Sequence, residues 1–210
     1  MTHVIPPPAE LFSAGRRHLV VLAHQDDELP NAGTISRMGT EVRVVWLTNG
    51  DGLVHESEDT PERYGERRTD ESIEACAHLG FDRDQLVFLG PSELRIYSLL
   101  AALSRRTGAV DVPPLFNEMG EQVRQEALSF EPDVIWTMAY QGGHPEHDLA
   151  HLCAASAARE LSAPLYELPA YELTFLVPLR FPPWRRDAYH EIRLRDDEHA
   201  TLQAMFESYP

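Results

Sequence analysis

The sequence of 210 residues contains no lysine and only two cysteines, and all of its apolar runs are short. Runs of this length cannot cross a bilayer, which argues against membrane spans. All 18 basic residues are arginines and they face 34 acidic residues, so the net charge of −16 argues against nucleic acid as a partner. Cys76 and Cys153 lie in segments with helical patterns, and we expect both to be reduced thiols packed in the core.

The start of the chain also lacks the continuous apolar stretch behind a basic end that a secretory signal requires. Three consecutive prolines, Pro6–Pro8, stand there instead. We therefore expect a cytoplasmic protein. The length favours one domain over residues 1–210, with a core over about 17–162 and a less regular part over about 163–210.

Apolar segments with many β-branched residues predict four buried strands, at His18–Ala23, Glu41–Thr48, Gln85–Gly90 and Asp133–Ala139. Helical spacing predicts helices over Pro61–Leu79, Asn117–Phe130, about Glu146–Leu161, and within Asp196–Tyr209. Strands that alternate with helices favour βαβ units with right-handed crossovers. The predicted fold class is therefore α/β, with a mainly parallel sheet covered by helices on both faces.

Polar loops follow the first, second and fourth predicted strands, at His24–Glu28, Thr48–Gly52 and Tyr140–His147. Since ligands of parallel sheets bind at the carboxyl ends of the strands, we expect these loops to share one edge. The first loop places three consecutive carboxylates directly after a buried strand. Like charges repel and lose hydration there, so a stable site requires either open water or a cation.

A divalent metal meets this requirement, because His144 and His147 of the third loop add imidazoles to His24 and the acids of the first loop. Asp27, three residues after His24, is expected to return to the metal side, which leaves Asp26 free as a base. One of His144 and His147 would bind the metal while the other leans over the substrate. Alone, the acids indicate a solvated helix start and the histidines exposed polar residues. Their convergence at one edge favours a metal site.

The same two loops carry the motifs AHQDDE at Ala23–Glu28 and GHPEH at Gly143–His147. These resemble the A-H-P-D-D-E and G-H-x-D-H signatures of the PIG-L/LmbE-like family of zinc-dependent N-deacetylases. The resemblance extends through WLTNGDG, RTDESIEACAHLG and LVFLG and covers Leu19–Ala157. It implies a Rossmann-like fold and removal of an acetyl or similar acyl group from an amide nitrogen, commonly on a glucosamine-type sugar.

By this resemblance, His24, Asp27 and His147 would hold zinc, Asp26 would be the general base, and His144 would be the electrophilic or acid histidine. Iron(II) suits the same set of two imidazoles and one carboxylate. Zinc is the expected cofactor, with iron(II) as the alternative.

The chain also departs from the family pattern. Gln25 stands where proline is usual, which loosens the turn but removes no ligand. Glu146 replaces the usual aspartate, and we expect its longer carboxylate to orient His144. The resemblance assigns Arg68 and Glu93 to substrate binding. The alternatives are an ion pair within its own helix for Arg68 and a surface carboxylate for Glu93.

The expected function is hydrolysis of a small-molecule N-acylated substrate, with an N-acetylglucosamine-type sugar or conjugate favoured. A metal hydrolase of a non-sugar amide, or a non-catalytic sugar- or nucleotide-binding module, are the alternatives. The sequence has no G-x-G-x-x-G after the first strand, which argues against a dinucleotide site. It leaves open whether the protein is a monomer or a homo-oligomer.

Overall fold

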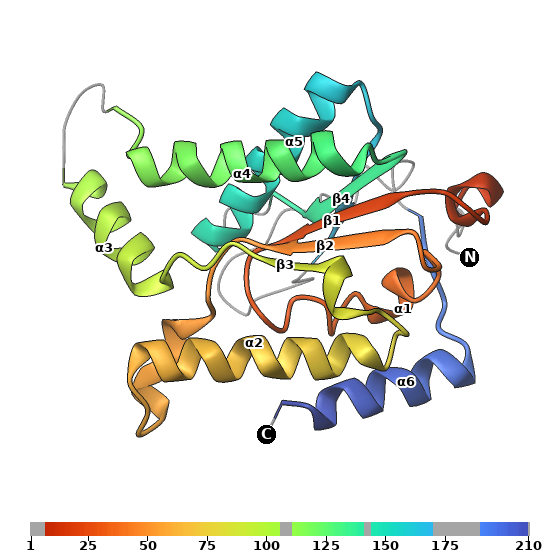
Figure 1. Ribbon diagram of the computed structural model, residues 1–210, viewed down its shortest axis with the longest axis horizontal. Helices are drawn as coiled ribbons and strands as arrows, with labels where there is room; N and C mark the ends of the chain where they lie inside the picture. Colours follow the sequence, from red (N-terminus) through yellow and green to blue (C-terminus); the bar gives the residue numbers. More distant parts are fainter. Residues whose placement is uncertain (1–6, 106–110, 141–143, 170–189, 210) are drawn as a thin grey trace, which may run out of the picture.

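The computed structural model describes residues 7–105, 111–140, 144–169 and 190–209 (Figure 1). Within these residues, five parallel strands form one sheet in the order β3-β2-β1-β4-β5. The strands are β1 (His18–Leu22), β2 (Val42–Trp46), β3 (Leu86–Phe88), β4 (Val134–Met138) and β5 (Leu165–Leu168). The four predicted strands are all present, and the predicted α/β fold class is confirmed.

Helices cover both faces of the sheet, as predicted (Figure 1). On one face lie α4 (Pro114–Phe130) and α5 (Pro145–Leu161), and on the other lie α1 (Ala32–Ile35), α2 (Pro61–Ala77) and α6 (Asp196–Glu207). The remaining described helices are α3 (Glu93–Ser104) and the short 3-10 helices η1 (Ala9–Phe12), η2 (Asp51–Glu56) and η3 (Arg83–Gln85). Each strand of the centre is therefore enclosed by helices.

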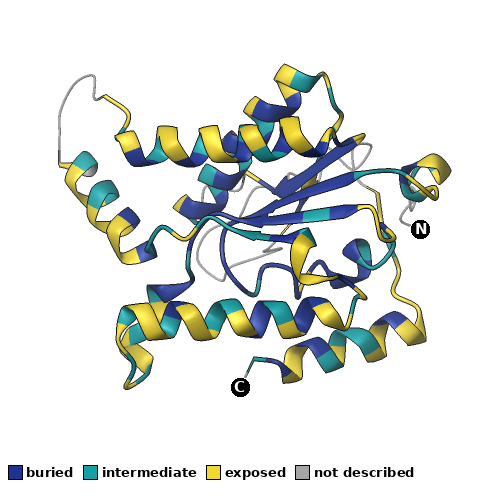
Figure 2. Ribbon diagram, viewed as in Figure 1, coloured by how far each residue is buried: buried dark blue, intermediate teal, exposed yellow. Residues whose placement is uncertain are grey.

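Alternate side chains of β1 enter two different cores. Leu19 and Val21 pack in the cluster that includes residues of α4 and α5, whereas Val20 and Leu22 pack with residues of α1 and α2. Each such fully buried aliphatic side chain contributes about 1.5–3 kcal/mol. β1 and β4 are accordingly buried along their whole length, while each long helix keeps an exposed stripe (Figure 2). This burial fixes the ends of the strands, where the polar loops begin.

Helix ends agree with the predicted signals within a few residues. Thr60 caps α2 by accepting a hydrogen bond from the backbone N–H of Arg63, and Gly80, just past the helix, has φ of +80°. α4 begins at Pro114, three residues before the predicted start, because proline at the first helical position needs no N–H partner. α5 begins in the same way at Pro145, with His144 as its N-cap residue.

The sequence analysis did not predict α3 or β5. β5 lies in the part expected to be less regular, and its pairing with β4 is a contact between distant segments. Whether the whole chain is one domain stays a prediction, because residues 170–189 lie outside the described part. Cys76 and Cys153 are free and buried, as expected. Among the described residues, no helix is both long and apolar enough to span a membrane.

Candidate metal centre and catalytic loop

The carboxyl ends of β1, β2 and β4 bring the three predicted loops together. His24 follows β1, Thr48 follows β2, and His144 and His147 begin the helix that follows β4. The Thr48 hydroxyl donates to the carbonyl oxygen of Ala23 at 2.9 Å, which ties the first two loops to each other. The polar residues of distant segments therefore share one edge, as expected for a parallel sheet.

Two imidazoles and one carboxylate converge at this edge. His24 Nδ1 lies 3.2 Å from His147 Nε2, which lies 3.0 Å from Asp27 Oδ1. His24 Nδ1 is also 3.6 Å from Asp27 Oδ2. Tetrahedral ligands bound to zinc at 2.0–2.1 Å stand about 3.3 Å apart, which is close to the separations of His147 Nε2 from His24 Nδ1 and from Asp27 Oδ1. His144 adds a third ring nitrogen, within 4.8 Å of those of His24 and His147. The cluster can bind a metal.

Asp27 is held by its own turn. Its Oδ2 accepts hydrogen bonds from the backbone N–H groups of Ala23 and His24, at 3.0 and 2.8 Å. This bonding leaves Oδ1 facing His147 and returns Asp27 to the side of His24, as the spacing predicts. Burial acts to raise the pKa of Asp27, but hydrogen bonds from His147 and His24 lower it well below its usual value. The carboxylate is therefore ionised inside the protein.

The raised pKa of His24 shows that the carboxylates at this edge of the sheet stabilise a positive charge. Burial alone would lower its pKa, but the hydrogen bond and charge of Asp27, together with the charges of Glu93 and Asp26, raise it to about 9. Without a metal, the imidazole therefore takes up a proton at neutral pH. A divalent cation among the same carboxylates would satisfy the same electrostatic demand.

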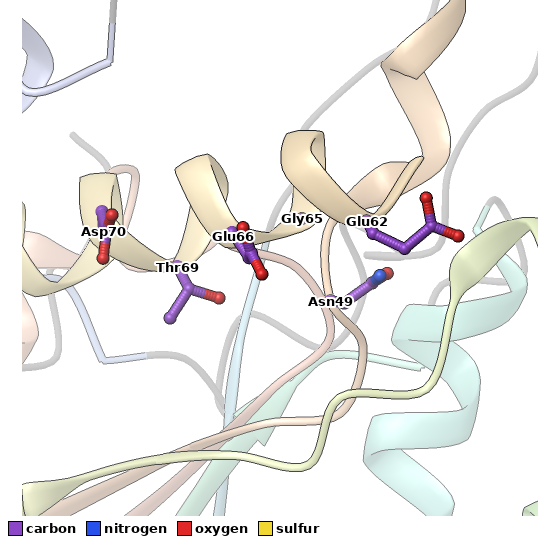
Figure 3. Close-up of a pocket in the computed structure, with 6 residues that line it drawn as sticks. All are labelled: Asn49, Glu62, Gly65, Glu66, Thr69 and Asp70. Atoms are coloured by element: carbon purple, nitrogen blue, oxygen red, sulfur yellow. The ribbon is translucent and has the colours of Figure 1, made fainter. Parts of the chain in front are cut away.

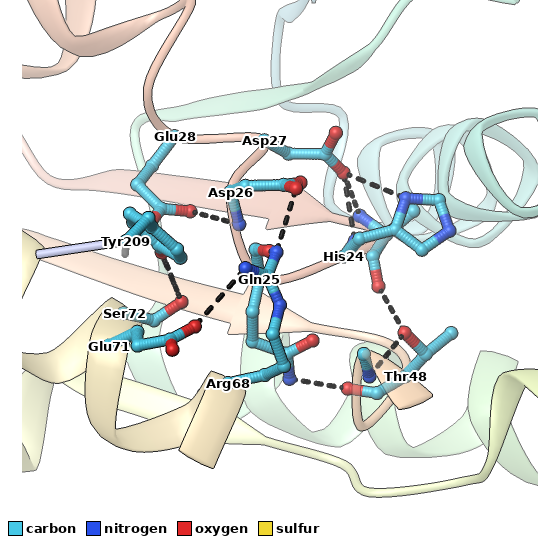
Figure 4. Close-up of polar contacts among 12 residues, drawn as sticks. His24, Gln25, Asp26, Asp27, Glu28, Thr48, Arg68, Glu71, Ser72 and Tyr209 are labelled. Atoms are coloured by element: carbon cyan, nitrogen blue, oxygen red, sulfur yellow. Dashed lines mark hydrogen bonds and ion pairs between the residues drawn. The ribbon is translucent and has the colours of Figure 1, made fainter. Parts of the chain in front are cut away.

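The side chain of Asp26 forms an ion pair with Arg68 (Figure 4). Its Oδ2 accepts a 2.7 Å hydrogen bond from Arg68 Nη2, and its side chain is 47% exposed. Its φ of 129° is a backbone conformation that costs a non-glycine residue about 1–3 kcal/mol. Partial removal from water and the charge of Asp27 raise the pKa of Asp26, although Arg68 opposes the shift. Asp26 is thus paired with Arg68, and its charge also acts on His24.

His144 lies over the cluster and contacts Glu146. Its ring stacks on His147 with centroids 4.6 Å apart and meets His24 edge-on at 4.5 Å. His144 Nδ1 lies 3.0 Å from a carboxylate oxygen of Glu146, which is fully buried. The longer side chain of glutamate therefore still reaches the histidine. When the ring proton of His144 is on Nδ1 and faces this carboxylate, Nε2 can make a hydrogen bond to another partner.

A sequence profile of the PIG-L family, described as GlcNAc-PI de-N-acetylase, matches residues 19–158, more than half of the chain. The chain belongs to the PIG-L family. The resemblance drawn from the two motifs is confirmed.

A curated relative of this PIG-L chain is the 1D-myo-inositol 2-acetamido-2-deoxy-alpha-D-glucopyranoside deacetylase of Thermomonospora curvata. It is 34% identical over 165 residues, which cover 70% of this chain and 54% of the relative. The chain spans about half the length of the curated relatives it matches.

Solved structures share the fold of this PIG-L chain. A zinc-inhibited form of teicoplanin deacetylase matches with a TM-score of 0.61 and 18% identity, covering 91% of this chain and 83% of that one. GalB, the 4-carboxy-2-hydroxymuconate hydratase of Pseudomonas putida, matches with a TM-score of 0.53 and 16% identity, covering 92% and 82%. One is a deacetylase and the other a hydratase, so likeness at this level shows the fold and not the reaction.

The two residues assigned to substrate binding already have partners in the PIG-L chain. Arg68 donates to Asp26 and to the carbonyl of Gln25, and it pairs with Glu71 at 3.2 Å, so the ion pair within its helix is present. Glu93 is only 5% exposed, which makes the surface alternative wrong. It accepts from the Thr48 hydroxyl at 3.1 Å and lies 3.9 Å from His24 Nε2. Glu93 therefore borders the cluster, whereas Arg68 contacts the neighbouring loop residues Gln25 and Asp26.

Gln25 does more in this PIG-L chain than the sequence predicts. Its side chain is fully buried, and its amide nitrogen donates to the carbonyl of Thr48 at 2.8 Å. The residue that replaces the usual proline thus links the end of β1 to the end of β2, which does not agree with a loosened turn. In the sequence, only the length of the Gln25 side chain and its amide group hint at such a link, and neither identifies the Thr48 carbonyl as the partner.

Glu28 and Tyr209 form a second polar group that sequence reasoning missed. Glu28 is fully buried and accepts from Tyr209, from the indole N–H of Trp46 at 3.2 Å, and from the backbone N–H of Asp26 at 3.2 Å (Figure 4). Burial raises the pKa of Glu28 to about 7, against the effect of the Tyr209 hydrogen bond. The third acid of the loop therefore supports the loop and lies outside the metal cluster.

An open groove of about 550 Å³ lies along α2 beside the loop after β2 (Figure 3). Its lining consists of Asn49, Glu62, Gly65, Glu66, Thr69 and Asp70. None of the three clustered imidazoles is among these residues, and three of the six carry a carboxylate. The groove is therefore separate from the metal-binding atoms of this PIG-L chain.

Proposed function

We propose that the chain is a metal-dependent N-deacetylase that releases acetate from an N-acetylglucosamine-type sugar or conjugate. The observation that carries this proposal is the position of His147 Nε2, which lies 3.2 Å from His24 Nδ1 and 3.0 Å from Asp27 Oδ1. The substrate class is supported by the PIG-L family and by the printed name of the curated relatives, deacetylases of a 2-acetamido-2-deoxy-glucopyranoside. The substrate is thus a small N-acylated molecule.

In this proposal, His24, Asp27 and His147 hold the metal, and zinc is its identity because two imidazoles and one carboxylate with an open position suit a catalytic zinc. Iron(II) is the alternative for the same donors. A zinc ion bound there would lower the pKa of water toward about 7 and polarise the acetyl carbonyl.

Asp26 acts as the general base in the proposed reaction. It is suited to this role because its carboxylate is half-exposed and its pKa is raised, which makes it a better proton acceptor than Asp27. Asp26 takes a proton from the attacking water, whose oxygen bonds to the acetyl carbon. The C–N bond then breaks as this proton is delivered to the leaving nitrogen, which departs as the free amine. The acetic acid formed passes its own proton to the amine or to solvent according to pH and leaves as acetate.

His144 supplies a hydrogen-bond donor to the oxygen that becomes negative in this reaction. The buried carboxylate of Glu146, 3.0 Å from His144 Nδ1, would fix the orientation of the ring. Glu93 borders the cluster and Arg68 borders Asp26, and both would contact the sugar hydroxyls.

The test is acetate release from the zinc-loaded protein with a panel of N-acetylglucosaminides and with N-acetyl amino acids as non-sugar amides. We expect turnover of the sugars, and an Asp26→Asn variant should lose about 10²–10⁴-fold in kcat while it keeps stoichiometric zinc. Glu74→Gln is the matched control, because Glu74 is an exposed acid on α2. Parental turnover by Asp26→Asn would refute the assigned base, and turnover of the amino acids alone would refute the sugar substrate.

A further inference from the structure

Tyr209, which follows α6, reaches the supports of the proposed catalytic loop from the far end of the sequence. Its hydroxyl donates to the carboxylate of Glu28 and lies 2.8 Å from the Ser72 hydroxyl. Its ring lies under Arg68, with the guanidinium carbon 4.9 Å from the ring centroid. Burial and the charge of Glu28 raise the pKa of Tyr209, so its hydroxyl stays protonated and remains a donor. One side chain thus contacts two residues that contact Asp26.

Glu28 and Arg68, the two residues that Tyr209 contacts, both form hydrogen bonds with Asp26. Glu28 accepts the backbone N–H of Asp26 at 3.2 Å. Arg68 donates to the Asp26 carboxylate at 2.7 Å and also to the carbonyl of Gln25, one residue earlier. Because Asp26 has a φ of 129°, its backbone would relax to an ordinary conformation unless neighbouring groups held it. The clamp formed by Glu28 and Arg68 provides this restraint.

Tyr209 is itself fixed by the packing of α6. Met205 is fully buried in a cluster with Leu29 and Ala75, and Tyr209 packs against the same cluster. This cluster joins α6 to α2 and to the residue directly after Glu28. The hydroxyl and ring of Tyr209 therefore meet the clamp from a position that three segments determine together.

We propose that Tyr209 is a positioning residue for the proposed general base: it orients Glu28 through its hydroxyl and Arg68 through its ring, and so holds Asp26 in its productive conformation. This role rests on the proposed deacetylase function. It gives the C-terminal segment with α6 and Tyr209 an indirect part in setting the rate of the reaction, through Glu28 and Arg68.

The test compares Tyr209→Phe, which keeps the ring but loses the hydroxyl, with Tyr209→Ala, which loses both. Phe206→Ala is the matched control, because it removes an aromatic side chain from α6 that is 54% exposed. We expect kcat to fall about tenfold in Tyr209→Phe and about a hundredfold in Tyr209→Ala, with KM and zinc affinity within about twofold of the parent. Parental kcat in Tyr209→Ala would overturn the proposal. The proposal would also be overturned if Tyr209→Ala lost activity only because it lost zinc, so that kcat per zinc-loaded molecule equalled that of the parent.

A second measurement separates this proposal from the proposed function. Amide hydrogen exchange of the peptide covering residues 24–29 in the zinc-loaded protein should accelerate about tenfold in Tyr209→Ala and stay unchanged in Phe206→Ala. This readout requires no substrate. A parent protein that released no acetate would refute the deacetylase function, whereas unchanged exchange of this peptide in Tyr209→Ala would refute the role of Tyr209.

Discussion

Two buried histidines stand at opposite ends of the first strand, and their ionisation is opposite. His18 begins β1 and is fully buried. Burial, with a smaller effect of Arg16, lowers its pKa to about 4. His24 lies just past the other end of the strand, and its pKa is raised to about 9, although burial acts on it in the same direction. The difference lies in the neighbours of the two rings.

His18 accepts a hydrogen bond at Nδ1 from the indole N–H of Trp136, at 3.0 Å, and a proton on that nitrogen would set two donors against each other. His24 instead meets Asp27, and Glu93 lies 3.9 Å away. Apolar burial therefore keeps one imidazole neutral, whereas buried carboxylates turn the other end of the same strand into a site for a cation. The comparison shows that the electrostatics favour a cation at the carboxyl end of β1 and not at its start.

The largest expected effect is the loss of metal-dependent stability at the His24 end. At a zinc concentration about 1,000-fold above Kd, binding should stabilise the parent by about 4 kcal/mol, which raises Tm by roughly 10 °C for a chain of this size. His24→Ala should abolish this rise because it removes one of the proposed ligands. Scanning calorimetry with and without zinc measures it, and His18→Gln is the control that should keep the full rise. An equal rise in His24→Ala would show that the metal binds elsewhere.

The next effect is acid sensitivity at the His18 end. The pKa of His18 is about 4 when folded and 6.5 in the reference state, so the unfolded chain binds more protons between these values. Its contribution to stability is complete above pH 6.5 and is lost as pH falls toward 4, by roughly 3 kcal/mol in total. The free energy of unfolding of His18→Gln should therefore fall less than that of the parent between pH 6.5 and pH 4. Urea unfolding at several pH values measures this.

The same substitution at an exposed site, His55→Gln, serves as the control for acid sensitivity. The side chain of His55 is 70% exposed, so this variant should follow the pH dependence of the parent. If His18→Gln lost stability as steeply as His55→Gln below pH 6.5, the neutral state assigned to His18 would be wrong.

The sequence was sufficient to predict most of the sheet and the edge where the loops meet. The central strands are continuous apolar runs, and His24, Asp27 and His147 follow two of them within a few residues, so local pattern and parallel topology together bring them close. α3 escaped prediction because its apolar residues do not keep one face: Leu94 and Tyr97 are both more than a third exposed.

Side-chain contacts between distant segments could not be predicted from the sequence. Tyr209 and Glu28 are 181 positions apart, and nothing near either residue identifies the other. The spacing predicts that Asp27 faces the imidazoles, but the acidic run gives no sign that Asp26 faces Arg68 and that Glu28 faces Tyr209. The unusual φ of Asp26 is likewise not visible in a sequence pattern. The ligand positions were thus easier to predict than the residues that hold the base.

The smallest expected effect concerns Gln25, which joins the metal-binding edge to the end of β2. Gln25→Met keeps the length of the side chain but removes the donor to the Thr48 carbonyl, which becomes an unpaired acceptor in a buried site. We expect a loss of about 1 kcal/mol in the free energy of unfolding, with zinc affinity within about threefold of the parent. Gln125→Met is the matched control, since that amide is exposed on α4, and it should change stability by less than about 0.5 kcal/mol. A Gln25→Met protein as stable as Gln125→Met would mean that the hydrogen bond to Thr48 adds nothing measurable, and the two loops would then be held by Thr48 and Ala23 alone.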